Sequence, residues 1–208
     1  MIHDIGFILL RTYIWLCRFR HRRGYGVHSP FAYNLIKGVF YEQGTYYAYK
    51  HLHELCNRNR LSITKRHAER IDKLLFRIAN YAVPETIWFC GKEDSPTAEY
   101  LKAARPNAHI RILPDKTACR QAIATSTVPD MLCLSSSENS KELLDLMEKR
   151  APIHAVTTWC GIHRNTRVRH QWKQYIERQH TGVTFDLYDV GVIFYNGNLQ
   201  KQHYIVNF

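Results

Sequence analysis

Short apolar runs alternate with amphipathic stretches over the second half of the chain. Residues 86–90 form an apolar run without polar alternation, which is typical of a strand covered on both faces of a parallel sheet. Gly91 ends the run, and Ser95 followed by Pro96 predicts the N-cap and first turn of a helix. In doubly wound sheets the loop between such a strand and helix lies at the ligand-binding edge, so we expect function there.

The same alternation continues to the end of the chain. Strands are expected at residues 109–113, 130–134, 153–159, 183–188, 191–195 and 203–208, with helices at about 116–124, 141–150 and 166–180. Strands that alternate with helices predict an α/β fold with a parallel sheet and right-handed crossovers. The closing strands are joined by short turns, and we expect them to be antiparallel.

Helical spacing of apolar residues dominates the chain before residue 83. Residues 64–82 form the clearest amphipathic helix, and Ser29 followed by Pro30 marks the start of another. The whole chain has 208 residues, which suits one well-buried core rather than two. We therefore expect a helical N-terminal extension, residues 1–82, to pack on an α/β domain of residues 83–208.

The first of these helices, at residues 2–19, is strongly apolar but is interrupted by Arg11 and followed by the basic segment 18–23. It falls short of the roughly 20 uninterrupted apolar residues that span a bilayer. Three interpretations remain open for its apolar face. It docks on the domain core, it lies in a membrane interface with the arginines near lipid phosphates, or it forms a dimer interface.

The net charge of +11 favours acidic partners such as RNA, DNA, anionic lipid or a phosphorylated substrate. The basic segments 18–23, 58–70 and 164–169 are the candidate contacts with nucleic acid or an anionic membrane. The alternative is that the charge only keeps the protein in solution.

The six cysteines include no Cys-x-x-Cys pair, and several lie inside apolar runs. They are interpreted as buried small side chains in a reducing compartment. The expected location is therefore the cytoplasm, or the inner face of the inner membrane if the N-terminal helix binds lipid.

Four collinear segments carry a family resemblance. They are GVHSPFAYNLI from residue 26, LLFRIANYAVPETI from residue 74, FDLYDVGVIFYN from residue 185 and QKQHYIVNF from residue 200. Together they resemble a family of class I S-adenosylmethionine-dependent methyltransferase-like proteins of the O-methyltransferase type, found mainly in Bacteroidetes. The resemblance implies a Rossmann-like methyltransferase sheet with a C-terminal antiparallel hairpin.

The resemblance also implies where S-adenosylmethionine would bind. The family's first strand ends in Glu-Leu-Gly followed by a second glycine, whereas this chain retains Gly91 and has Ser95 at the second position. Glu93 and Asp94 lie in the same loop. The acid that holds the cofactor ribose in the family is replaced by a leucine, which leaves Asp115 two residues later as its substitute.

Two further strand ends depart from the family pattern. Ser135 and Ser136 begin the segment that replaces Asp-Gly-Asn-His, and Cys160 stands where the family has the first of two aspartates. Mg²⁺ prefers such paired carboxylates, so no metal is predicted. His163 is retained and is the candidate general base. One strand-helix unit is missing, because residues 114–129 leave room for only one helix.

Two classes of function follow from these candidates. The first is a methyltransferase that acts on a small hydroxylated substrate without metal. The second is an inactive pseudoenzyme that serves as a basic binding module for nucleic acid, an anionic membrane or a protein partner. Each candidate site residue also has a structural interpretation: Ser95 and Asp115 as helix caps, Glu93 and Asp94 as solvated charges, and His163 as a structural histidine.

Overall fold

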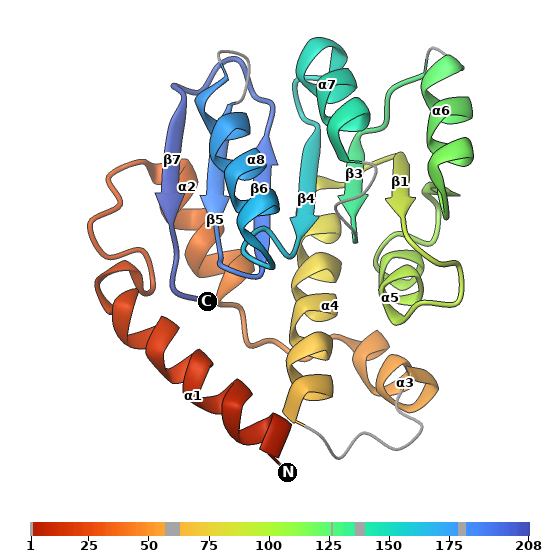
Figure 1. Ribbon diagram of the computed structural model, residues 1–208. Helices are drawn as coiled ribbons and strands as arrows, with labels where there is room; N and C mark the ends of the chain where they lie inside the picture. Colours follow the sequence, from red (N-terminus) through yellow and green to blue (C-terminus); the bar gives the residue numbers. More distant parts are fainter. Residues whose placement is uncertain (1, 57–62, 126, 136–139, 179–181) are drawn as a thin grey trace.

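A mixed sheet of seven strands, with helices on both of its faces, forms the centre of the molecule (Figure 1). The computed structural model describes residues 2–56, 63–125, 127–135, 140–178 and 182–208. The strands are β1 (Thr86–Cys90), β2 (His109–Ile112), β3 (Met131–Leu134), β4 (Val156–Cys160), β5 (Val183–Asp186), β6 (Val190–Phe194) and β7 (Gln202–Ile205). Their order is β2-β1-β3-β4-β6-β5-β7, which is compatible with a Rossmann-like fold.

The last strand runs opposite to β6, as predicted, but its pairing partner differs from the prediction. β6 is antiparallel to both β4 and β5, as expected, but β7 pairs with β5 in parallel. Both edges of β6 are already occupied by β4 and β5, so the returning chain cannot pair with β6. It passes to the far edge of β5 instead, where its direction makes the pairing parallel.

The helices after β1 agree with the predicted positions. They are α5 (Pro96–Ala104), α6 (Lys116–Ala124), α7 (Ser140–Arg150) and α8 (Thr166–Glu177). In the described residues α6 is the only helix between β2 and β3, so β2 remains at the edge of the sheet. This matches the missing strand-helix unit that was expected from the length of the segment.

The sheet separates two apolar cores, because successive side chains of a strand point to opposite faces. Ile87 and Phe89 of β1 face one core, whereas Trp88 and Cys90 face the other. The first core is completed by helices that precede the sheet and by α5, and the second by α6, α7 and α8.

The helices that precede the sheet are α1 (Ile2–Cys17), η1 (Phe19–His21), α2 (Pro30–Leu35), η2 (Ile36–Phe40), α3 (Tyr47–Cys56) and α4 (Ile63–Ala82). The buried side chain of Arg77 on α4 joins two of them, since its guanidinium donates to the carbonyl oxygens of Val39 and Phe40 at 2.7 and 3.1 Å. These bonds satisfy carbonyl groups at the end of η2, which an unpaired helix end would leave without partners.

α1 is placed differently from the other helices. Figure 1 shows it beyond the carboxyl ends of β5 and β7, at the edge of the molecule. Of its described side chains only Ile14 is fully buried. The contacts that hold α1 in this position define the most highly charged site of the protein.

Candidate functional site

The loop predicted to bind a cofactor is occupied by the chain's own side chains. A methyl group on Gly91 would lie 2.5 Å from Cζ of Phe89 and 2.6 Å from Oγ of Ser135. The Ser135 hydroxyl donates to the carbonyl oxygen of Cys90, and Ser95 Oγ accepts from the backbone N–H of Ala98 at 3.3 Å. Gly91 is therefore needed for the packing of the loop, and Ser95 acts as the N-cap of α5.

The other predicted cofactor contacts do not meet at one point. Asp115 is exposed and its Oδ1 accepts from the backbone N–H of Ala118 at 2.8 Å, which makes it the N-cap of α6. Glu93 and Asp94 are exposed in the loop after β1. Ser136 lies outside the described residues. None of these positions lines the arginine-rich pocket beside α1 or the two smaller pockets around Glu42 and Lys73.

His163, the candidate general base, belongs to a cluster that holds α1. Its Nε2 atom lies 2.7 Å from Oδ2 of Asp186 and 3.3 Å from a guanidinium nitrogen of Arg18. Arg18 also donates to Oδ1 of Asp186 at 2.8 Å. Burial would raise the pKa of Asp186, but the hydrogen bonds from His163 and Arg18 outweigh it and hold that pKa well below its usual range.

A second carboxylate of the same turn holds the first half of α1. Asp189 Oδ2 lies 2.7 Å from Nη1 of Arg11 and 3.0 Å from Nε2 of His67 on α4. Burial opposes ionisation here too, yet His67 and Arg11 lower the pKa of Asp189. Two carboxylates three residues apart therefore each bind one arginine of α1 and one histidine of the domain.

The ring of Tyr188 lies between these two clusters. It stacks on His163 with 4.9 Å between ring centroids, and the guanidinium groups of Arg18 and Arg11 lie 5.1 and 5.4 Å from its centre. Tyr188 has a backbone φ of 71°, in the left-handed region that non-glycine residues rarely adopt. Its backbone N–H donates to Oδ1 of Asp186 at 2.8 Å, which stabilises this turn.

α1 uses only a narrow stripe of residues for this docking. Phe7, Arg11, Ile14 and Arg18 recur at helical spacing, and between residues 5 and 18 they are the side chains that are buried or half-buried. Phe7 meets His67 edge to face at 5.4 Å. We call these four residues the docking stripe; two of them are arginines that are bound by carboxylates.

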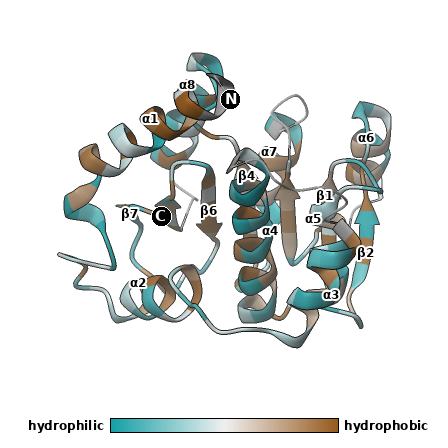
Figure 2. Ribbon diagram, turned by 90° about the horizontal axis from the view of Figure 1, so that it is seen from below, coloured by the Kyte–Doolittle hydropathy of each residue, from teal (hydrophilic) through white to brown (hydrophobic). Residues whose placement is uncertain are grey.

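The opposite face of α1 is apolar and directed away from the protein. Ile5, Leu9, Tyr13 and Leu16 are 54%, 66%, 67% and 60% exposed, and we call them the outer face. Figure 2 shows that hydrophobic residues extend along α1 at the side of the molecule. A helix that docked only to fill the core would direct these side chains inward, which is the reverse of what is observed.

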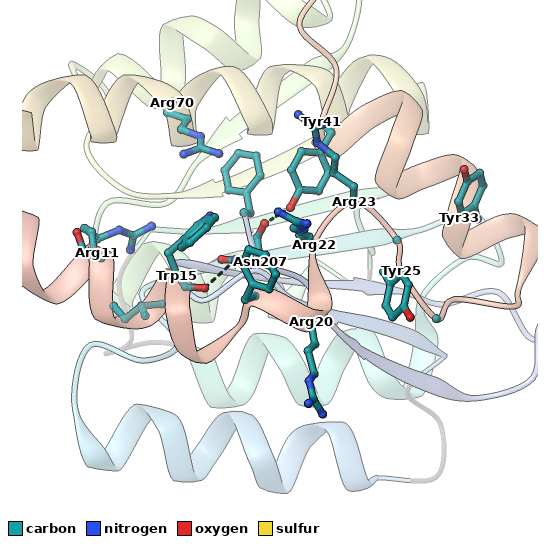
Figure 3. A pocket seen from close by; sticks show the side chains of 16 residues that line it. Arg11, Trp15, Arg20, Arg22, Arg23, Tyr25, Tyr33, Tyr41, Arg70 and Asn207 are labelled. Atoms are coloured by element: carbon teal, nitrogen blue, oxygen red, sulfur yellow. Dashed lines mark hydrogen bonds between the residues drawn. The ribbon is translucent and has the colours of Figure 1, made fainter.

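A large open groove lies between α1 and α4 (Figure 3). It has a volume of about 1540 Å³, and its cationic lining residues are Arg11, Arg20, Arg22, Arg23 and Arg70. Its aromatic lining residues are Trp15, Phe19, Tyr25, Tyr33, Tyr41 and Phe208. No acidic residue is among the described residues that line it. We call it the arginine groove.

Most of these arginines have no counter-charge. Among the described residues, Arg20, Arg22, Arg23 and Arg70 have no carboxylate within ion-pair distance, whereas Arg11 is bound by Asp189. Arg22 lies 3.9 Å above the ring of Phe19, and Arg70 lies 4.2 Å above the ring of Phe208. Desolvation and then repulsion from Arg11 lower the pKa of Arg70. Four arginines of the groove thus have no carboxylate side chain as a partner among the described residues.

Comparisons with known proteins do not identify the chain. No protein-family model matches it, and no curated protein matches it significantly. The function is therefore argued from the geometry of the described residues.

Two other kinds of site were sought in the part of the chain that the structure describes. It contains no group of three or more His, Cys, Asp or Glu side chains that could hold a metal ion, and no helix with the length and apolar character of a membrane span. Trp159, near the end of β4, is buried against Trp172 with 6.1 Å between ring centroids.

Sequence reasoning missed the residues that make this site. Arg11 was noted only as an interruption of an apolar run, and Asp186 and Asp189 were not singled out. The signal was the spacing: Arg11 and Arg18 are seven residues apart, which places them on one face of a helix. Asp186 and Asp189 flank a short turn between two apolar runs, where buried partners for such arginines are expected.

Proposed function

We propose that this protein is a peripheral membrane-binding module built on a methyltransferase-type Rossmann-like sheet. In this proposal α1 lies in the interface of an anionic bilayer. Its outer face enters the boundary of the acyl chains, and Arg20, Arg22 and Arg23 lie near the lipid phosphates.

The observation that carries the proposal is the orientation of α1. On its inward side, Arg11 is bound by the half-buried Asp189 and Arg18, directly after the helix, by the buried Asp186, while the large aliphatic side chains of α1 face outward. Asp4 is the only acidic residue among the first 40, so repulsion from an anionic surface is small there. Exposed Phe19 and Tyr25 follow α1 and extend the apolar surface among the arginines.

The magnitudes agree with reversible binding. Full burial of one large apolar side chain is worth about 1.5–3 kcal/mol, so the four half-exposed residues of the outer face together contribute about 5 kcal/mol. Three arginines near an anionic surface add about 1 kcal/mol each. A total of about 8 kcal/mol corresponds to roughly micromolar binding, before the cost of immobilising the protein is subtracted.

The residues that methyl transfer would need have other partners. The space above Gly91 is filled by Phe89 and Ser135, Asp115 caps α6, and His163 is bound to Asp186. These contacts support a protein that has kept the sheet and binds its ligand through α1 and the arginine groove. S-adenosylmethionine as cofactor and a small hydroxylated substrate remain predictions of the family resemblance.

Co-sedimentation with lipid vesicles tests the proposal. We expect binding to vesicles that contain phosphatidylglycerol, weaker binding to vesicles of phosphatidylcholine alone, and a loss of affinity as salt increases. Equal sedimentation with and without anionic vesicles would contradict the proposal. A tighter complex with single-stranded RNA that competes with the vesicles would assign the basic surface to nucleic acid instead.

A matched pair of variants locates the contact. Leu9→Gln combined with Leu16→Gln removes two outer-face side chains and should weaken vesicle binding about 30-fold. Ile153→Gln serves as the control, because Ile153 is 55% exposed but lies in the segment that leads into the amino end of β4, whereas α1 lies beyond the carboxyl ends of β5 and β7. The control should bind vesicles like the wild type.

A further inference from the structure

We infer that the arginine groove is a binding site for a phosphate monoester, presented as the headgroup of a lipid in the bilayer on which α1 lies. This inference deepens the proposed membrane function and rests on it. The site is separate from the loop after β1, and it differs from general attraction to negative charge because it selects one headgroup chemistry.

The first argument is the unbalanced charge of the groove. Figure 3 shows Arg70 reaching from α4 and Arg11 from α1 into the space between the two helices, with Arg22 and Arg23 farther along the groove. Arg20 points away from them, and in the proposed arrangement it lies near the phosphates of the membrane surface. A dianionic phosphate would relieve the repulsion between Arg11 and Arg70, and guanidinium groups bind phosphate oxygens in a bidentate way.

The second argument is that hydrogen bonds of the C-terminal segment fix the bottom of the groove. Asn207 is buried, and its Nδ2 donates to the carbonyl oxygen of Trp15 at 3.1 Å. The backbone N–H of Asn207 donates to the carbonyl oxygen of His21 at 2.9 Å. The Tyr41 hydroxyl donates to the carbonyl oxygen of Asn207. The C-terminal segment thus fixes the end of α1, η1 and Tyr41 relative to one another, which holds the groove open.

The third argument is continuity with the membrane surface. Trp15 lines the groove and is 47% exposed, and Leu16, the next residue of the helix, belongs to the outer face. A lipid whose acyl chains lie against the outer face therefore has its headgroup beside the mouth of the groove. The aromatic walls fit the glycerol and the start of the acyl chains, as tryptophan and tyrosine do at membrane interfaces.

A monoester is favoured over the diester of common anionic lipids because it carries more charge per phosphate. Of the four groove arginines that lack a carboxylate partner among the described residues, Arg20 points away, which leaves Arg22, Arg23 and Arg70 for the ligand. A diester headgroup supplies one negative charge and leaves most of the positive charge of these arginines unbalanced. A monoester carries up to two negative charges and three oxygens that accept hydrogen bonds.

Vesicles that differ only in headgroup test the site. Phosphatidylcholine vesicles are prepared with phosphatidic acid or with phosphatidylglycerol, at amounts that give equal measured surface potential. We expect the wild type to bind the phosphatidic acid vesicles about tenfold more tightly, because the monoester adds a charge-assisted bidentate contact. Equal affinity for the two vesicles would overturn the inference while leaving the membrane proposal intact.

Variants connect this preference to the groove. Arg70→Gln should reduce the preference for phosphatidic acid to about twofold or less and leave binding to phosphatidylglycerol within about threefold. Arg22→Gln, tested separately, should reduce the preference to the same extent and also weaken binding to phosphatidylglycerol about fivefold, because Arg22 lies near the lipid phosphates. Arg169→Gln, an exposed arginine on α8, is the control and should retain the full preference. A preference that survives both groove variants would place the monoester elsewhere and overturn the inference. Thermal unfolding of each variant checks that the fold is intact.

Calorimetry with glycerol 3-phosphate and with inorganic phosphate separates the lipid from a free phosphate ester. The Leu9→Gln, Leu16→Gln variant should bind both kinds of vesicle about 30-fold more weakly than the wild type, yet it should bind short-chain phosphatidic acid in solution like the wild type. Binding of glycerol 3-phosphate as tight as that of short-chain phosphatidic acid would support the site and assign it to a free phosphate ester. No binding of any of these ligands would overturn the inference.

Discussion

The polar side chains of the loop after β1 and those of the groove beside α1 differ in whether they have partners within the protein. At the loop, the hydroxyls of Ser95 and Ser135 and the carboxylate of Asp115 all bond to the protein's own backbone. In the groove, four arginines lack a carboxylate partner among the described residues, and large apolar side chains beside it face outward. The loop is satisfied within the chain, whereas the groove is complementary to something outside it.

This difference teaches where binding energy is available. A polar group that already has its partners gains little from a ligand, because it must exchange one hydrogen bond for another. An arginine without a counter-charge gains a full charge-assisted contact. The family resemblance directs attention to the first region, but the geometry of the described residues favours the second.

The largest effect is expected where α1 is joined to the domain. Asp186→Asn removes the charge that Arg18 and His163 share and should destabilise the fold by about 3 kcal/mol, because it leaves a largely buried guanidinium unpaired. Urea denaturation measures this change. Asp145→Asn is the comparison: its partner Arg178 is one-third exposed, and a loss of about 1 kcal/mol or less is expected.

The same cluster predicts a dependence on acidity. The folded-state pKa of Asp186 is lowered, so its stabilising contribution is complete above the ordinary carboxyl pKa of about 4 and is lost as the pH falls towards the lowered value. The difference in unfolding free energy between wild type and Asp186→Asn should therefore shrink as the pH falls below the ordinary carboxyl pKa of about 4. A difference that grows on acidification would show that Asp186 is not ionised in the folded protein.

A smaller effect is expected at the loop. Gly91→Ala places a methyl group within van der Waals overlap of Phe89 and Ser135, and overpacking of this kind typically costs about 1–3 kcal/mol. Thermal unfolding should show the loss of stability, and vesicle binding at a temperature where the variant is folded should be unchanged. A variant that keeps its stability and loses vesicle binding would reverse the roles assigned to the two regions.

The smallest effect is expected for the carboxylate that the resemblance assigns to the cofactor. Asp115→Ala removes the N-cap of α6 and should cost about 1 kcal/mol of stability. Isothermal titration of the wild type with S-adenosylmethionine and S-adenosylhomocysteine should give no binding. If the wild type bound S-adenosylmethionine with micromolar affinity and Asp115→Ala abolished that binding, the loop after β1 would be a working cofactor site.

Most of the fold could be predicted from the sequence because its signals are local. The apolar run before Gly91 and the caps at Ser95 and Asp115 fix the ends of β1, α5 and α6 by contacts within a few residues. The pairing partner of β7 could not be predicted, because it depends on which strand edge remains unpaired after the whole sheet has formed.

The site was harder to predict for the same reason. Arg18 and Asp186 are 168 residues apart in the sequence, and nothing near either residue indicates the other. The sequence did indicate that the N-terminal helix is apolar and followed by arginines, but it left three interpretations of that face open. The choice between them needs the direction in which Leu9 and Leu16 point, which the paired arginines on the opposite face determine.

One measurement tests the membrane claim most directly. Trp15 is 47% exposed on α1, while Trp88, Trp159 and Trp172 are at most 4% exposed, so an agent in the acyl chains can reach only Trp15. Anionic vesicles with brominated acyl chains should quench part of the tryptophan fluorescence, and Trp15→Phe should abolish that quenching. Vesicles that bind the protein without quenching Trp15, or that do not bind it, would contradict the account.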